Sequence, residues 1–221
     1  MRNFSQSVLK LSPSLSLLDW FTPDNYAQLT LGDLDLGICG VLLIPNSNVS
    51  VNGSKTGDFY VLHQNSLGHV QVGNGQIPQL LRVAPGHIHG APVYWNSPNR
   101  GPLIYVWAEE DALKAFHFNG TALDPSPVMQ SAIVASPGMP GGILSLSADG
   151  STAGSGILWA SLPLRGDALN NLVPGVLRAF DASDLTRELW HSAEAPSRDD
   201  PGYFAKFAPP TIANGKVYLA S

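Results

Sequence analysis

The chain has 221 residues, of which 44% are hydrophobic and 13% are charged, and its net charge is −5. Its 22 glycines and 18 prolines exclude a coiled coil and a helical bundle, because these two residues are the poorest helix formers. The apolar content excludes a disordered chain, and an acidic balance without a basic stripe predicts no nucleic-acid partner. The single cysteine, Cys39, excludes an internal disulfide framework.

The two indications of cellular location conflict. No apolar run approaches the ~18 residues needed to cross a bilayer, and residues 1–7 lack the apolar segment of a secretory signal. The low charge and the abundance of Asn, Ser, Gly and Thr favour an exported protein. The sequence therefore predicts no membrane span and leaves the compartment open, although full-length relatives are expected to be periplasmic or extracellular.

Short β-strands are predicted along the whole chain, each bounded by Gly, Pro, Asn or Asp. In chain order the clearest lie at 8–12, 17–21, 40–44, 59–63, 91–95, 104–107, 113–117, 142–146, 157–160, 177–181, 188–190, 210–213 and 217–220. Related segments begin at residues 8, 59, 113 and 177, so the unit recurs after 51, 54 and 64 residues. No segment carries a sustained helical pattern.

Four short strands in every ~40 to 50 residues are typical of a β-propeller blade. The predicted fold class is therefore all-β, a β-propeller of four-stranded antiparallel blades, with about four blades in a single domain or half-domain, 1–221. Three predicted blades are internal, at 34–70, 86–125 and 138–192. The fourth combines the two ends of the chain, 206–221 plus 1–26. A β-sandwich is the alternative, although it would need no such repeat.

One repeat unit carries a family resemblance. Residues 179–190, Ala-Phe-Asp-Ala-Ser-Asp-Leu-Thr-Arg-Glu-Leu-Trp, resemble the Ala-x-Asp-x-x-Thr-Gly-x-x-x-Trp repeat of the bacterial quinoprotein-alcohol-dehydrogenase-like (PQQ-like) β-propellers. Segments 11–20, 19–23, 87–95 and 209–218 are also similar to this superfamily. The resemblance implies part of an eight-bladed ring, with each repeat tryptophan docked on a neighbouring blade. It also implies a quinone beside vicinal cysteines, and because one cysteine cannot supply that pair, pyrroloquinoline quinone is not expected in this piece.

Two pairs of polar residues are candidate metal ligands. His87 and His89 have i, i+2 spacing, which places both side chains on one face of an extended segment, and they precede the innermost strand of their blade. Asp33 and Asp35 have the same spacing one blade earlier. We expect calcium or zinc if these groups converge at one mouth of the channel. The alternatives are histidines that bond to backbone carbonyls and aspartates that form turns.

Other residues are candidates for ligand contact. Trp95 and Trp107 could stack on a quinone or a sugar, and Lys206 precedes the last inner strand, so these three are predicted to bind a cofactor. The run 109–111, Glu-Glu-Asp, is either a calcium cluster or a tight hairpin with solvated acids. No catalytic residue is identified.

The predicted function is that of a binding or assembly scaffold with a site in the central channel for a small molecule or a protein. One alternative is a lactonase-like hydrolase, in which a metal held by His87, His89 and an aspartate activates water. The other is a quinone-dependent oxidoreductase.

The predicted strands at the two ends of the chain are complementary halves of a blade. Pairing within one molecule would close a four-bladed ring, and pairing between two molecules would give a homodimer with an eight-bladed ring. The third possibility is a truncated piece of a longer product.

Overall fold

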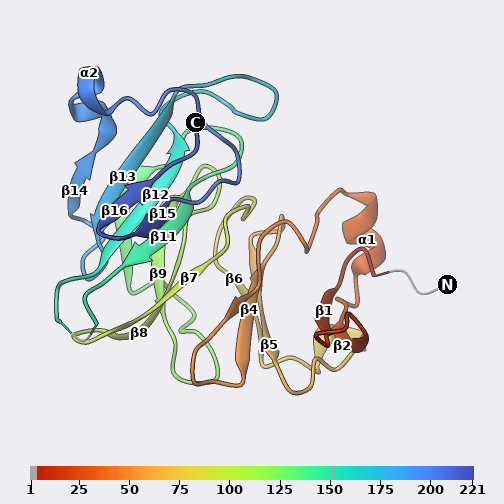
Figure 1. Ribbon diagram of the computed structural model, residues 1–221. Coiled ribbons are helices and arrows are strands. Elements are labelled where there is room, and N and C mark those ends of the chain that lie inside the picture. Colours follow the sequence, from red (N-terminus) through yellow and green to blue (C-terminus); the bar gives the residue numbers. More distant parts are fainter. Residues whose placement is uncertain (1–3, 151) are drawn as a thin grey trace.

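The computed structural model describes residues 4–150 and 152–221, and almost all of its regular structure is β (Figure 1). Three four-stranded antiparallel sheets form the body of the molecule, and in each one the strands are adjacent in chain order. The first blade contains β3 Leu42–Leu43, β4 Val49–Gly53, β5 Asp58–His63 and β6 Gln79–Arg82. The second contains β7 Val93–Ser97, β8 Gly101–Val106, β9 Ala112–His117 and β10 Met129–Val134. The third contains β11 Ile143–Ser147, β12 Ile157–Pro163, β13 Gly175–Asp181 and β14 Glu188–His191.

A two-stranded sheet flanks the blades on each side. The N-terminal half-blade pairs β1 Val8–Leu11 with β2 Leu17–Phe21, and the C-terminal half-blade pairs β15 Thr211–Ala213 with β16 Lys216–Tyr218. Figure 1 shows these half-blades at opposite sides of the array. The fourth predicted blade, 206–221 plus 1–26, is therefore divided between two separate sheets in this molecule.

The array is a β-propeller of four-stranded antiparallel blades, as the sequence predicted. The first strands of successive sheets lie together, since β11 contacts both β7 and β15. In a propeller these first strands border the central channel.

The predicted limits of two blades differ from the observed strands. β6 follows residue 70 and β10 follows residue 125, so the predicted blades 34–70 and 86–125 leave out their outermost strands, whereas 138–192 encloses the whole third blade. A long connection containing the short helix η1 Val72–Asn74 separates β5 from β6. Such an excursion breaks the regular spacing on which the prediction depended.

Helices are few and short: α1 Tyr26–Leu31, η2 Ser192–Glu194 and α2 Pro196–Asp199, besides η1. In the described residues, no helix has the length and apolar character needed to cross a membrane.

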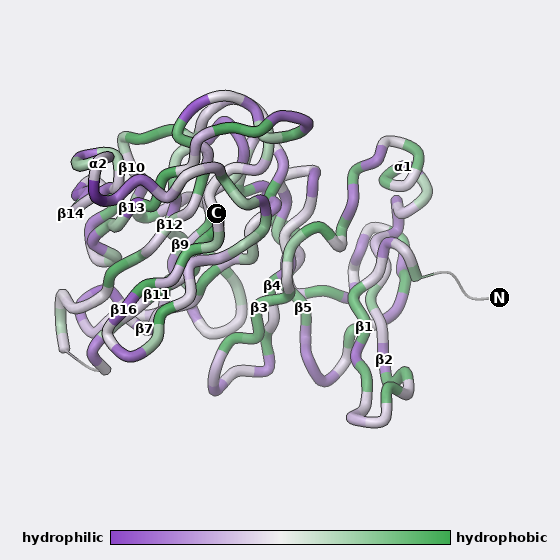
Figure 2. Tube along the Cα trace, turned by 45° about the horizontal axis from the view of Figure 1, so that its top comes forward, coloured by the Kyte–Doolittle hydropathy of each residue, from purple (hydrophilic) through white to green (hydrophobic). Residues whose placement is uncertain are grey.

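The hydrophobic core lies between the sheets, where the hydrophobic stretches of the strands gather in Figure 2. One cluster joins the second and third blades through Trp107 and Phe180, whose ring centroids are 5.6 Å apart. Another joins the first and second blades through Phe59 and Ile104. A third includes Phe21 and joins the N-terminal half-blade to the first blade. Packing between neighbours therefore holds the array together.

Two glycines allow the tryptophans to dock. A Cβ at Gly142 would lie 2.7 Å from the Trp107 ring, and one at Gly156 would lie 2.5 Å from the Trp95 ring. Since real Cβ atoms do not approach other atoms so closely, each tryptophan of the second blade occupies space that a glycine of the third blade leaves open.

Candidate metal centre

The same backbone hydrogen bond recurs in all three blades. The loop before the first strand meets the connection between the second and third strands, and we call this contact the junction of the blade. The Lys55 amide donates to the Asp35 carbonyl at 3.0 Å, and the Glu109 amide donates to the His87 carbonyl at 3.0 Å. In the third blade the Ala168 amide donates to the Met139 carbonyl at 3.3 Å. The three acceptors are residues 35, 87 and 139, which are 52 residues apart.

An ion pair occupies the first junction. The Lys55 Nζ lies 2.9 Å from a carboxylate oxygen of Asp33 and 2.7 Å from one of Asp35. Burial lowers the pKa of Lys55, but the hydrogen bonds that its ammonium donates to Asp35 and Asp33 outweigh this effect, so that the pKa lies above its usual value. The lysine thus engages both aspartates that the sequence offered as metal ligands.

Two histidines and a glutamate meet at the second junction. The His89 Nε2 lies 2.7 Å from the Glu109 Oε1, and the His87 Nδ1 lies 3.3 Å from the Glu109 Oε2. The His89 side chain is 1% exposed, whereas that of His87 is 39% exposed. Among the His, Cys, Asp and Glu residues of the described chain, these three form a group whose potential metal-ligand atoms all lie within 4.8 Å of one another. Asp33 and Asp35 are outside it.

The donor set suits a divalent transition metal. Two imidazoles and one carboxylate are ligands that Zn²⁺ accepts at about 2.0 to 2.2 Å, and three protein ligands leave one tetrahedral position open. Calcium prefers six to eight oxygen ligands, which this group does not offer. Of the two metals expected from the sequence, zinc therefore matches these residues better.

A cavity of about 220 Å³ lies beside His89, bordered by the loops before β3, β7 and β15 and by the start of β11. His89 lines it, and the Phe207 ring is centred 5.9 Å from the His89 ring. The His89 Nδ1 is buried and has no hydrogen-bond partner among the described residues. Buried polar atoms normally have a partner, so this nitrogen is an exception in the folded chain.

The remaining wall of the cavity is apolar or inert. Cys39 lines it, and its Sγ accepts a hydrogen bond from the Gly53 amide at 3.1 Å. Burial raises the pKa of the Cys39 thiol to about 11, which keeps the sulfur protonated at neutral pH. A thiol in that state is a poor nucleophile and a poor metal ligand.

The predicted cofactor residues are not brought together. Trp95 is 6% exposed and Trp107 is 1% exposed, and both belong to the core between the second and third blades. The Lys206 Nζ donates to the Leu169 carbonyl at 2.8 Å, and this residue lines a different cavity from the one at His89. These three side chains, with a single buried cysteine, do not form a site that fits a quinone.

The part played by Glu109 was missed in the sequence, where it belonged to an acidic run. The structure separates the three acids of that run. Glu110 accepts the Gly138 amide at 3.2 Å, and Asp111 pairs with Lys114 at 2.6 Å. Lys55 stands 54 residues before Glu109, which is close to the repeat length. This spacing was the available signal that Glu109 lies opposite the loop that carries His87, as Lys55 lies opposite the loop that carries Asp35.

No protein-family model matches the chain, and the search of curated proteins found no significant relative. Among solved structures, the computationally designed Ika8 protein is 10% identical, with a TM-score of 0.49, over 82% of this chain and 42% of that one. BamB from Moraxella catarrhalis is 11% identical, with a TM-score of 0.45, over 97% of this chain and 64% of that one. The designed Ika4 protein is 11% identical, with a TM-score of 0.43, over 83% and 98% of the two chains. This chain thus spans less than two thirds of the Ika8 and BamB chains.

Proposed function

We propose that this protein is a propeller scaffold that binds Zn²⁺ at the second junction and holds a small ligand in the adjoining cavity. His87, His89 and Glu109 supply the metal ligands, and the open coordination position serves the bound ligand. The observation that carries the proposal is that the ligand atoms of two imidazoles and one carboxylate all lie within 4.8 Å of one another. The repeat at 179–190 supports placing the chain among quinoprotein-like propellers.

Rigidity at the second junction supports this proposal. The loop that carries the histidines is fixed by the Glu109 amide, which bonds to the His87 carbonyl, and the Ile88 amide bonds to the Ser54 carbonyl at 3.2 Å. Ile88 itself is fully buried between the two ligands. A metal bound here meets side chains whose positions are already restricted, so that little entropy is lost on binding.

The test is a zinc titration of protein first stripped with a chelator. His87→Ala and Glu109→Gln should each weaken zinc binding by about 100-fold, that is, by nearly 3 kcal/mol. The matched control is Asp35→Asn, at the equivalent position of the first junction, which should leave the affinity unchanged. Unaltered affinity in the first two variants, or calcium binding in preference to zinc, would contradict the proposal.

A lactonase-like hydrolase is the second candidate function, favoured by the cavity that His89 lines and by a set of three protein ligands, which would leave one coordination position open for a water molecule. In that case the metal would polarise a carbonyl and activate a water molecule. The third ligand of that metal would be Glu109, whereas the sequence predicted an aspartate in this role. Zinc-loaded protein should then hydrolyse simple lactones, and Glu109→Gln should lower the rate at zinc concentrations that saturate only the wild-type protein. Quinone-dependent oxidation stays a prediction from the repeat alone.

A further inference from the structure

A polar cavity of about 590 Å³ lies in the seam between the first and second blades, and we call it the seam cavity. One wall is the hairpin between β3 and β4, and the other is formed by β7, the start of β8 and the turn that follows β9. Both blades are complete four-stranded sheets. The volume lies within the range of about 300 to 1,000 Å³ that small-molecule sites usually have.

The seam cavity is separate from the candidate metal centre. The junctions join the loop before the first strand to the connection between the second and third strands. The seam cavity is bordered instead by the connection between the first and second strands of one blade and by the end of the third strand of the next. Because neighbouring strands are antiparallel, these two sets of connections lie at opposite ends of the sheets. A ligand in the seam cavity therefore does not meet His87, His89 or Glu109.

Asparagine side chains border the seam cavity from both blades. All four are exposed: Asn46, Asn48, Asn96 and Asn119. Asn48 and Asn119 use their Oδ1 atoms to accept backbone amides of their own loops, which fixes these two side chains. Among the described residues, neither Asn46 nor Asn96 has a hydrogen-bond partner for its side chain. Each free amide offers one acceptor and two donors.

Tyr94 supplies an aromatic ring beside these amides. Tyr94 and Asn96 are two residues apart on β7, so both side chains are on the same face of the strand. Their partners on β8 are Ile104, which belongs to the core between the two blades, and Pro102, which lines the seam cavity. The face that is apolar at the core thus becomes polar where the seam opens. Burial raises the pKa of Tyr94, so the hydroxyl stays protonated at neutral pH.

His117 also borders the seam cavity. Its partner on β8 is Leu103, one residue from Pro102, so its side chain starts from the face of the sheet opposite to that of Tyr94. The His117 Nδ1 lies 3.5 Å from a carboxylate oxygen of Asp124, which offsets the charge of this histidine when it is protonated.

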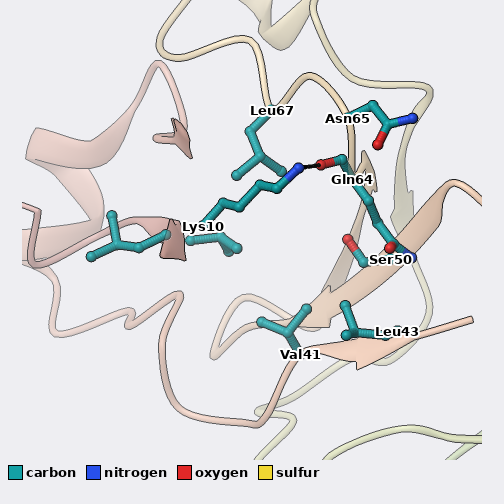
Figure 3. Close-up of a pocket in the computed structure, with 9 residues that line it drawn as sticks. Lys10, Val41, Leu43, Ser50, Gln64, Asn65 and Leu67 are labelled. Atoms are coloured by element: carbon teal, nitrogen blue, oxygen red, sulfur yellow. Dashed lines mark hydrogen bonds between the residues drawn. The ribbon is translucent and has the colours of Figure 1, made fainter. Parts of the chain in front are cut away.

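Two other cavities differ in chemistry from the seam cavity. The one of about 410 Å³ between the second and third blades is lined by Arg100 and Asp184, which carry opposite charges. The one of about 340 Å³ beside β1 presents Val41, Leu43 and Leu67, so its wall is largely apolar (Figure 3). The seam cavity instead combines uncharged amides with an aromatic ring.

We propose that the seam cavity binds a neutral carbohydrate. Adjacent hydroxyl groups of a sugar both donate and accept hydrogen bonds, and an asparagine amide can satisfy both roles. The Tyr94 ring has an apolar face for the C–H groups of a pyranose and a polar hydroxyl at its end. A charged ligand would gain no ion pair from the asparagines, so a neutral ligand suits this wall best.

A peptide suits the seam cavity less well. Peptides that bind to β-sheets commonly add to an open strand edge, where main-chain hydrogen bonds supply the affinity. The seam cavity is lined by hairpin and turn residues and by side chains on one face of β7. It therefore offers side-chain amides and not a row of main-chain groups.

Calorimetric titration of the full chain with neutral trisaccharides tests the proposal. The probes are maltotriose, cellotriose and triacetylchitotriose, and at least one should bind with a Kd on the order of 1 mM or below. The affinity should not change with salt concentration, because no charge of the ligand is involved. Absence of binding for every probe at about 10 mM, or tighter binding of the anionic trigalacturonate, would overturn the proposal.

Two variants locate the bound sugar. Asn96→Ala removes an exposed amide, and Asn46→Gly removes another at a residue whose φ of 55° glycine adopts without strain. Each should weaken binding by about tenfold, the effect of losing a well-formed hydrogen bond. The matched control is Asn99→Ala, which is exposed in the hairpin between β7 and β8 and does not line the seam cavity. Unchanged affinity in both variants, or displacement of the sugar by an uncharged Gly-Ser peptide, would contradict a carbohydrate site here.

Discussion

Cys39 shows how one buried atom couples the protein to pH. Its thiol has an ordinary pKa of 9.0, and desolvation in the cavity wall raises that value to about 11 in the folded chain. Between these two values the unfolded chain has lost a proton that the folded chain still holds. The free energy of unfolding therefore falls as the pH rises through this range, and the contribution of Cys39 is complete below pH 9.

The corresponding variant is Cys39→Ser, whose hydroxyl can still accept the Gly53 amide but does not ionise. Wild-type protein should lose on the order of 2 kcal/mol of stability between pH 9 and 11 beyond any loss in the variant. Urea denaturation at pH 8, 9, 10 and 11 measures the difference. Tyr60, whose pKa burial raises to about 12, contributes to both proteins and cancels in the comparison. Parallel curves for the two proteins would show that the thiol is not desolvated.

The candidate site illustrates which residue contacts a sequence can predict. His87 and His89 could be paired from the sequence because two residues apart on extended backbone share a face. Glu109 joins them through a hairpin that brings position 109 back to position 87, and neither residue type nor local spacing indicates that contact. Asp33 and Asp35 had the same local pattern as the histidines, but Lys55 engages them. The chemistry of each junction depends on the side chain that the connection between the second and third strands brings to the loop, Lys55 in one blade and Glu109 in the next. That side chain lies about 20 residues further along the sequence.

At the scale of elements, the contacts between blades bury the largest apolar side chains. Trp107 is 1% exposed, stands edge-on to Phe180 and fits over Gly142. Trp159 lies in the adjacent blade, is only half-buried and bonds through Nε1 to the Ser147 hydroxyl at 3.0 Å. Removal of the first side chain opens a cavity between two blades, whereas removal of the second mainly exposes a surface.

We therefore expect Trp107→Ala to lower the free energy of unfolding by about 3 to 5 kcal/mol, the usual cost of deleting a large aromatic side chain from a core. Trp159→Ala should cost less than half as much. Urea denaturation, monitored by circular dichroism so that the lost tryptophan does not affect the signal, gives both values. Similar losses in the two variants would mean that the blades are not held by the tryptophan contact.

Strands were predictable where their spacing was regular. The inner strands and hairpins of each unit combine β-branched or aromatic runs with turn residues, and such runs can be recognised singly. The outer strands β6 and β10 are reached by connections of irregular length, so the repeat did not locate them. Trp95 and Trp107 were assigned to a ligand because a sequence does not show which face of a strand meets the next blade.

The backbone bond repeated at residues 35, 87 and 139 separates architecture from chemistry. Each junction is closed by a main-chain amide and a main-chain carbonyl, while the side chains at the three places are an ion pair, a histidine–glutamate group and a methionine. Exchange of a side chain there leaves the closing bond intact. One backbone frame thus carries three sets of side chains of different chemistry, so a substitution at residue 35, 87 or 139 changes what the junction presents without removing the bond that closes it.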